Sequence, residues 1–264
     1  MLKKSSPIAV FDSGIGGISV LKELISTLPN ENFIYFGDTA NAPYGVKSAF
    51  QVRALSFSAY ERLKKEGIKA FVIACNTATS VAVASLREKY PNDIIIGVEP
   101  ALKPATKCCD NPTVAVLATP LTLKEEKFAL LLDRFGSGAR VIPFACPGLV
   151  EFVERGEIKG ERLHSFLEEL LAPLKEERLD AVVLGCTHYP FVKAEISKVL
   201  GANVQIFDGS VGTALQTRRR LEENGLLNDS DKKGSIIFID SSHPDTKDAS
   251  DSTLVRFGGE YICS

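Results

Sequence analysis

The chain has 264 residues, of which 45% are hydrophobic and 24% charged, and its formal net charge at pH 7 is −2. This composition is ordinary for a soluble globular protein, and the near-neutral charge gives no electrostatic reason to expect nucleic acid or an anionic membrane as a partner. No stretch approaches the roughly 18 apolar residues of a membrane span, which argues against a membrane protein.

Short apolar runs rich in β-branched residues are the candidate strands. In chain order they are residues 8–11, 32–37, 70–74, 93–98, 113–118, 140–144, 180–185, 204–207 and 235–240. They read as continuous apolar runs, which is typical of strands buried on both faces of a parallel sheet.

Amphipathic segments between these runs are the candidate helices. They include residues 17–28, 48–66, 77–89, 122–135, 160–171, 191–200 and 210–224. In the first, Ile18, Leu21, Ile25 and Leu28 recur at three- and four-residue steps, which marks one helical face. Strands that alternate with helices predict an α/β protein with parallel sheets.

The best internal break is the proline-rich segment GVEPALKPATKCCDNP at 97–112, which could join two lobes. Two similar stretches fall on either side of it, VIACNTAT at 72–79 and VLGCTHYP at 183–190. Each ends an apolar run with a cysteine followed by small polar residues. This pattern hints at a weak internal repeat with one strand-end cysteine in each half.

Polar and ionisable residues follow nearly every predicted strand. In open α/β sheets, ligands bind beyond the carboxyl ends of the strands, so these residues are the candidates for a site. They are Asp12-Ser13-Gly14, Asp38-Thr39, Pro43-Tyr44-Gly45, Cys75-Asn76-Thr77, Thr119 and Cys186-Thr187-His188.

The cysteines at 75 and 186 are the central candidates. We expect each to precede a helix start, where backbone N–H groups and the helix dipole can lower a thiol pKa from its usual value of about 8.5. A single buried cysteine is more often an inert core residue, but a matched pair at two strand ends favours function. The six cysteines, which include Cys108, Cys109, Cys146 and Cys263, form no CxxC pair. That absence favours a reduced, cytoplasmic protein.

Asp12 opens the glycine-rich stretch DSGIGGIS, which resembles a dinucleotide-binding loop but has Ser19 where the third glycine of that motif belongs. The carboxylate could hold a substrate ammonium or orient a base, and the alternative is a helix cap. Cys186, His188 and Cys75 form no standard zinc spacing, so we expect no metal site. His164 and the arginines at 218–220 are expected on the surface, and His243 is expected in a loop.

Two thiols facing one cleft from opposite sides would suit inversion of a carbon stereocentre. A thiolate on one face removes a proton, and a thiol on the other face returns one. Running the reaction in both directions needs two similar groups in opposite protonation states. A nucleophilic cysteine enzyme would need only one thiol with a dedicated histidine base.

Four motifs then identify a family. FDSGIGG (11–17), YFGDTANAPYG (35–45), ACNTAT (74–79) and LGCTHYP (184–190) occur in this order, and with them the chain closely resembles glutamate racemases over essentially its whole length. These are cofactor-independent racemases that supply D-glutamate for bacterial peptidoglycan. The resemblance implies an α/β fold of two lobes, each with a mainly parallel sheet flanked by helices, with the active site in the cleft between them. It also implies a homodimer. We expect residues 1–97 and 207–264 in the first lobe and 98–206 in the second.

The resemblance also implies roles for individual residues. Cys75 and Cys186 match the catalytic acid/bases, Asp12 and His188 match residues that assist them, and Glu154 matches an acidic residue near the second cysteine. The residues implied to bind substrate are Asp12, Ser13, Pro43, Tyr44, Gly45, Asn76, Thr77, Thr119, Thr187 and His188.

The chain also departs from the family pattern. In CPGLVEFVERG (146–156), Gly148, Glu151 and Arg155 replace the family's Leu, Pro and Glu, and Ala118 replaces a Gly before Thr119. Some relatives have a long N-terminal extension and need a UDP-linked muramic acid precursor as activator. The first predicted strand begins by residue 8, so we do not expect that regulation here.

Three rival functions stay open. The first is a racemase of aspartate or hydantoin, which would share the two-cysteine plan. The second is a non-catalytic two-lobed protein that closes on a dicarboxylate and would need neither thiol. The third is a thiol-dependent hydrolase or a metal protein. His188 and the Pro43-Tyr44-Gly45 segment favour glutamate.

Overall fold

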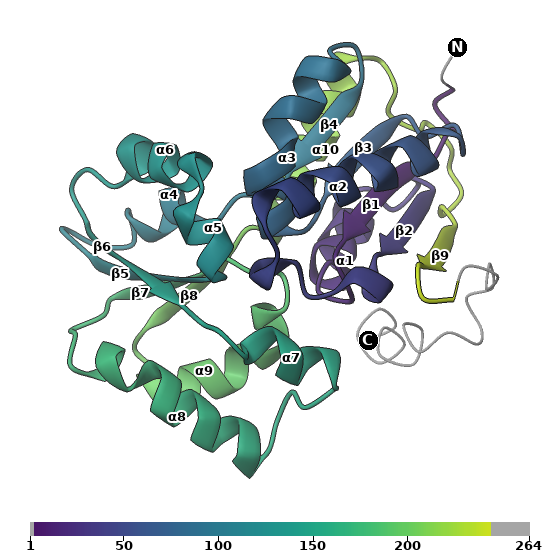
Figure 1. The fold of residues 1–264 in the computed structure, drawn as a ribbon. Helices are drawn as coiled ribbons and strands as arrows, with labels where there is room; N and C mark the ends of the chain where they lie inside the picture. Colours follow the sequence, from purple (N-terminus) through teal and green to yellow (C-terminus); the bar gives the residue numbers. More distant parts are fainter. Residues whose placement is uncertain (1–2, 244–264) are drawn as a thin grey trace.

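A computed structural model describes residues 3–243 of the chain. It contains two separate parallel sheets, which lie in one molecule with helices packed on their faces (Figure 1). The strands are β1 (Ile8–Asp12), β2 (Phe33–Gly37), β3 (Ala70–Ile73), β4 (Ile94–Gly97), β5 (Thr113–Ala118), β6 (Arg140–Ala145), β7 (Ala181–Leu184), β8 (Gln205–Asp208) and β9 (Ile236–Asp240). All nine predicted strands are confirmed, with shifts of at most one residue at their ends.

The first sheet has the strand order β4-β3-β1-β2-β9, and the second has the order β6-β5-β7-β8. Every pairing is parallel; in the first sheet Ile8 lies opposite both Phe33 and Ala70. Parallel neighbours bring all carboxyl ends of a sheet to one edge. The predicted α/β class with two mainly parallel sheets is therefore confirmed.

The helices fill the connections between strands. They are α1 (Ile18–Thr27), α2 (Ala49–Lys64), α3 (Asn76–Lys89), α4 (Leu102–Ala105), α5 (Pro120–Lys124), α6 (Glu126–Phe135), α7 (Leu149–Glu154), α8 (Glu161–Lys175), α9 (Lys193–Leu200) and α10 (Ser210–Glu223). Three short 3₁₀ segments complete the list: η1 (Thr39–Asn41), η2 (Tyr44–Val46) and η3 (Tyr189–Val192). Among residues 3–243, no helix is long and apolar enough to cross a membrane.

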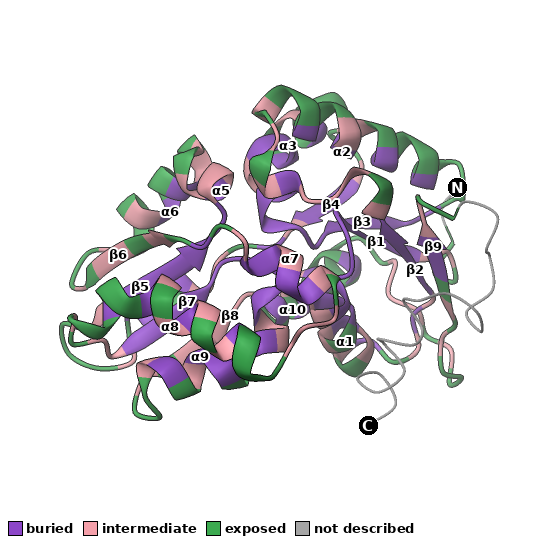
Figure 2. Cartoon of the chain, turned by 60° about the horizontal axis from the view of Figure 1, so that its bottom comes forward, coloured by how far each residue is buried: buried purple, intermediate pink, exposed green. Residues whose placement is uncertain are grey.

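Alternate residues of the central strands face opposite helix layers. In β1, Ile8 and Val10 belong to a core with α1 and α10, whereas Ala9 and Phe11 belong to a core with α2 and α3. Burial on both faces explains why this strand reads as a continuous apolar run. Figure 2 shows the buried strands between helices whose outer faces are exposed.

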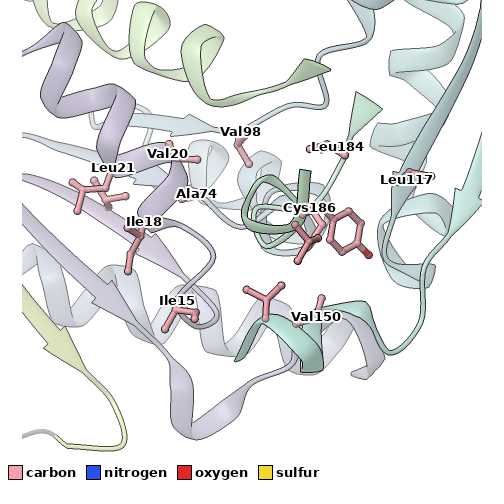
Figure 3. Close-up of a cluster of buried hydrophobic side chains, with 14 of the residues drawn as sticks. Ile15, Ile18, Val20, Leu21, Ala74, Val98, Leu117, Val150, Leu184 and Cys186 are labelled. Atoms are coloured by element: carbon pink, nitrogen blue, oxygen red, sulfur yellow. The ribbon is translucent and has the colours of Figure 1, made fainter. Parts of the chain in front are cut away.

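The larger core runs from one sheet to the other. Ile15, Ile18 and Val98 from the first-sheet side belong to the same buried cluster as Leu117 and Leu184 from the second sheet (Figure 3). The chain leaves the second sheet after β8, and α10 then packs against α1 and β4 before β9 joins the first sheet. This path suits two lobes, and the boundaries at 97/98 and 206/207 stay a prediction.

Several helical segments differ from the sequence expectation; among them, α4 was not predicted and α8 extends to Lys175, beyond the predicted end at 171. The predicted helix 122–135 is broken at Glu125, whose backbone is extended, so α5 and α6 are separate. The predicted helix 191–200 begins as the 3₁₀ turn η3, and α9 starts only at Lys193. The six-residue α7 was not predicted, because fewer than two turns leave little periodic signal.

Candidate active site

One pocket collects residues from the carboxyl ends of both sheets. It encloses about 450 Å³, including the open space at its mouth. Its lining contains Ser13, Pro43, Tyr44, Gly45, Val46, Cys75, Asn76, Thr77, Thr119, Pro120, Cys146, Pro147, Gly148, Val150, Glu151, Cys186, Thr187 and His188. Cys75 reaches it from the end of β3 and Cys186 from the end of β7, so each sheet supplies one thiol.

Among the residues to which the family resemblance gave a role, Asp12 and Glu154 do not line the pocket; the strand-end candidates Gly14, Asp38 and Thr39 do not line it either. Asp12 and Glu154 each lie behind a residue that does. Asp12 is fully buried, and its Oδ2 accepts a 3.0 Å hydrogen bond from Thr187 Oγ1. Glu154 Oε1 lies 2.5 Å from His188 Nε2. Both carboxylates therefore hold pocket residues in place and do not face the pocket themselves.

Cys75 is the N-terminal cap of α3. Its Sγ accepts a hydrogen bond from Ala78 N at 3.4 Å and donates one to Ser13 Oγ at 3.5 Å. Burial and the nearby charge of Asp12 raise the pKa of this thiol to about 12. The hydrogen bond from Ala78 N opposes this shift, but its effect is smaller. The proton is therefore held firmly on Cys75 until a ligand or a neighbouring charge changes its surroundings.

Cys186 has different surroundings. It lies in a bend, a turn follows it, and the 3₁₀ segment η3 starts at Tyr189 with His188 as its N-terminal cap, so Cys186, unlike Cys75, caps no helix. Its Sγ lies 3.8 Å from His188 Nδ1. Because the carboxylate of Glu154 can only accept, it fixes His188 Nε2 as the donor and leaves Nδ1 facing the thiol. The three side chains form a relay that can take a proton from Cys186.

His188 is fully buried, and burial by itself lowers its pKa. The hydrogen bonds to Cys186 and Glu154 and the nearby charge of Asp12 outweigh that effect and raise the pKa well above its usual value. The imidazolium is thus the favoured form when a negative charge lies on Cys186 or Glu154. This ring suits the storage of a proton beside the thiol.

The glycine-rich loop after β1 lets the backbone approach this relay closely. A Cβ at Gly14 would meet Glu154 Oε1 at 2.0 Å, and one at Gly16 would meet His188 Nδ1 at 2.4 Å. Ile15 N also donates to Glu154 Oε1 at 3.2 Å. The glycines of DSGIGGIS therefore pack the loop against protein side chains.

Asp12 does not cap α1, whose N-terminal cap is Gly17 without a side-chain bond. Its Oδ1 instead accepts from Gly14 N at 2.9 Å within the loop. Burial raises the pKa of Asp12, and the charge of His188 opposes that shift. The cap interpretation of Asp12 is therefore wrong.

The segment after β2 supplies another wall of the pocket. Tyr44 lines the pocket and is buried, and its hydroxyl donates to Asp38 Oδ2 at 2.5 Å, so that proton is already engaged within the protein. A Cβ at Gly45 would lie 2.8 Å from Thr119 Cβ, so only glycine fits there. This contact sets the η2 turn against the second-sheet side of the pocket.

Asn76 and Thr77 begin α3 beside Cys75, and both are buried. Among the residues that the structure describes, the Asn76 side-chain oxygen is one of two buried side-chain atoms with no hydrogen-bond partner. A buried acceptor without a partner is costly, and a ligand donor such as an ammonium group would satisfy it.

Several pocket residues were missed by the sequence analysis: Val46, Pro120, Cys146, Pro147, Gly148, Val150 and Glu151. Three of the seven, Cys146, Pro147 and Gly148, form the turn between β6 and α7. The strand-end rule, applied after residues 140–144 as it was after the other strands, would have found Cys146. Glu151 carries no such signal, because it lies on the short helix α7.

Other sequence expectations have a clear place in the structure. Arg218, Arg219 and Arg220 are exposed and pair with Glu222 or Glu223 on α10, which confirms a solvated helix face. Cys108 and Cys109 are free thiols, and Cys263 lies outside the described residues. Within residues 3–243, no group of three or more His, Cys, Asp or Glu side chains is arranged to hold a metal ion.

Residues 13–216 match the family model of Asp/Glu/hydantoin racemases. The chain belongs to this family. A glutamate racemase of Clostridium botulinum is 51% identical over 242 residues, which cover 92% of this chain and 94% of the relative. The match begins just after Asp12 and includes Cys75 and Cys186.

Solved structures of the family have the same fold. A glutamate racemase isoform from Bacillus anthracis superimposes with a TM-score of 0.86 at 31% identity, covering 99% of this chain and 95% of the other. A glutamate racemase from Francisella tularensis, solved in complex with D-glutamate, gives a TM-score of 0.82 at 32% identity, with coverage of 99% and 95%.

Proposed function

We propose that this protein is a glutamate racemase that interconverts L- and D-glutamate with two cysteine acid/bases. The observation that carries the proposal is the presence of one thiol from each sheet in a single pocket, Cys75 and Cys186. The family relatives named as glutamate racemases support the choice of substrate.

In one direction, a thiolate removes the α-proton of the bound enantiomer, and the electron pair of the broken C–H bond stays on the α-carbon. The opposite thiol then donates its proton to the other face of that carbon. The product has the inverted configuration, and the two sulfurs have exchanged protonation states. The reverse reaction uses the same groups in the opposite roles.

The surroundings of the two thiols suit this exchange of roles. His188, held by Glu154, can accept the proton of Cys186 and leave a thiolate beside an imidazolium. Cys75 keeps its proton in the empty pocket, because burial and the charge of Asp12 raise its pKa to about 12. We therefore infer that Cys186 is the base of the resting protein and that Cys75 is the acid.

Substrate binding would rely on neutral donors. Among the described residues that line the pocket, none is lysine or arginine, whereas Ser13, Thr77, Thr119 and Thr187 offer hydroxyl groups. We propose that these hydroxyls, with backbone N–H groups, bind the two carboxylates, and that Asn76 accepts from the α-ammonium. Pro43, Tyr44 and Gly45 would close one side of the bound substrate.

The wider role follows the family resemblance. We propose that the protein works in the cytoplasm as a homodimer and supplies D-glutamate for peptidoglycan synthesis. Light scattering coupled to gel filtration would test the assembly: a mass near twice the 28.6 kDa of the chain is expected, and a mass of one chain would refute the dimer.

Proton NMR in D₂O tests the reaction directly. Pure protein with excess chelator is incubated with D- or L-glutamate, and we expect loss of the α-proton signal together with interconversion of the enantiomers. Cys75→Ser and Cys186→Ser should each abolish interconversion. Cys146→Ser is the matched control, since Cys146 is a third thiol in the same pocket and should be dispensable.

No exchange with either enantiomer of glutamate would refute the proposed substrate, and aspartate and hydantoins would be assayed next. Binding of glutamate without exchange would favour a non-catalytic binding protein. Interconversion that survives in one of the two serine variants would refute the two-thiol mechanism.

A further inference from the structure

Three buried threonine hydroxyls meet beside the pocket. Thr77 Oγ1 lies 2.9 Å from Thr119 Oγ1 and 3.1 Å from Thr122 Oγ1, and the last two atoms are 2.8 Å apart. The three residues are at most 5% exposed. Thr77 begins α3 on the first-sheet side, whereas Thr119 and Thr122 belong to the start of α5, which follows β5 of the second sheet.

The three hydroxyls differ in their access to the ligand space. Thr77 and Thr119 line the active-site pocket, whereas Thr122 lies behind them and lines a separate cavity. Thr119 is also held from two sides, because its Oγ1 accepts from Thr122 N at 3.3 Å and its side chain fits against Gly45. Thr122 therefore contacts two pocket hydroxyls without facing the pocket.

A count of protons shows what Thr122 can do. Three hydroxyls have three protons, and all three can lie within the triangle while the pocket is empty. A carboxylate only accepts, so Thr77 and Thr119 must turn their protons outward to bind one. Their two oxygens would then lie 2.9 Å apart with no proton between them. Apart from the backbone N–H of Thr122, which donates to Thr119 Oγ1, only the hydroxyl proton of Thr122 remains within the triangle to donate to one of them.

We propose that Thr122 is a positioning residue that frees the hydroxyl protons of Thr77 and Thr119 for a carboxylate of the substrate. This inference rests on the proposed binding of glutamate and extends it to a residue outside the pocket lining. Without Thr122, one of the two pocket hydroxyls must donate to the other, and the carboxylate loses a charge-assisted hydrogen bond.

Thr122→Val keeps the shape of the side chain and removes its proton. We expect the KM for both enantiomers of glutamate to rise about tenfold, the effect of losing roughly one hydrogen bond to a charged group. The kcat should stay within about threefold, because neither thiol is touched. Thr122→Ser retains the hydroxyl and should restore KM to within about twofold of the unmodified protein.

Thr217→Val is the matched control. Thr217 is also a fully buried helical threonine, but its hydroxyl donates to Thr213 O within α10, away from the pocket. Its KM should not change. An unchanged KM in Thr122→Val would overturn the proposal. A KM in Thr122→Ser that is raised as much as in Thr122→Val would overturn it as well. If Thr122→Val does not fold, Thr122→Ala replaces it in the same comparison with Thr122→Ser.

Calorimetric binding of D-glutamate and of glutarate, which has two carboxylates and no ammonium, separates this inference from the proposed function. If the unmodified protein binds either ligand without racemising glutamate, the proposed function fails, and weaker binding by Thr122→Val still supports the role of Thr122. If the unmodified protein binds neither ligand, both proposals fail.

Discussion

The thiols of Cys75 and Cys186 differ in the groups that surround them. Cys75 is bounded by an uncharged hydroxyl, a backbone N–H and a buried carboxyl group that disfavours its thiolate. Cys186 has a histidine at 3.8 Å whose far nitrogen is held by Glu154. In the two-thiol mechanism proposed above, these different surroundings would let the two cysteines start in opposite protonation states.

The effect of the Asp12 charge on the thiol of Cys75 should be measurable. Because that charge raises the thiol pKa, Asp12→Asn should lower it and speed alkylation of Cys75 by iodoacetamide at pH 8 by at least about threefold. Mass spectrometry of the peptide that contains Cys75 gives the rate. Asp208→Asn is the matched control, since Asp208 also ends a strand and accepts from the backbone two residues on. An equal or slower rate in Asp12→Asn would contradict the assignment.

His188 should make stability depend on pH. Its folded-state pKa is raised by Cys186 and Glu154, so its contribution is complete below the unfolded-state value of about 6.5 and is lost as the pH rises through the folded-state pKa. Glu154→Gln should therefore lower the Tm most near pH 6. The difference in Tm between the variant and the unmodified protein should decrease toward pH 9. Glu151→Gln, one turn earlier on α7, should show no such trend. A Tm difference for Glu154→Gln that does not depend on pH would refute this link between His188 protonation and stability.

At the scale of elements, the long periodic helices and the buried strands were predictable, and the short irregular segments were not. The helix α7 shows why. Four of its six residues are buried, but the helix is held at its start by Gly148 in a left-handed conformation and at its end by the bond of Glu154 to His188. Such anchors depend on contacts from other parts of the chain.

Gly148 should be intolerant of substitution. Its φ is +84°, and a Cβ there would lie 3.2 Å from the Phe166 ring, so Gly148→Ala should destabilise the protein by about 1–2 kcal/mol. Gly212→Ala provides the opposite case. That glycine lies inside α10 with open space around it, and the alanine should stabilise by about 0.5–1 kcal/mol. Urea unfolding of both variants measures whether the free energy of unfolding falls or rises. A more stable Gly148→Ala variant would contradict the argument from the left-handed backbone of Gly148.

At the scale of the whole molecule, a buried lysine ties distant parts of the chain together at the edge of the first sheet opposite the pocket. Lys69, just before β3, pairs with Glu31 and donates to the carbonyl groups of Lys4 and Leu226. Glu31 in turn accepts from Asn228 N at 2.8 Å. This cluster holds the segment after α10 against the first sheet, next to the path that leads to β9.

Breaking this pair should be costly. Lys69→Met leaves Glu31 buried without its partner, and we expect a loss of about 3–5 kcal/mol in the free energy of unfolding. The double variant Lys69→Met with Glu31→Gln removes the unpaired charge and should recover part of the loss. Urea denaturation measures both, with Lys89→Met, whose pair with Glu61 is exposed, as the control. A double variant less stable than Lys69→Met would contradict the role given to the buried charge.

The sequence by itself determined the strands, the parallel α/β class and most of the pocket. Apolar runs reveal strands buried on both faces, and the rule that ligands bind at the carboxyl ends of parallel strands led directly to Ser13, Cys75, Thr119 and Cys186. The four motifs added the family, and with it Glu154.

Only the tertiary structure decided which of these residues face the pocket and which stand behind it. Asp12 and Glu154 proved to hold Thr187 and His188, and Thr122 proved to join two pocket hydroxyls. The partners are far apart along the chain, 175 residues for Asp12 and Thr187 and 34 for Glu154 and His188. The spacing of apolar residues in the sequence indicates which face of a helix or strand is buried. Hydrogen bonds between different elements depend instead on how the two sheets pack together. That packing produces no periodic pattern in the sequence, so these hydrogen bonds could not be predicted from it.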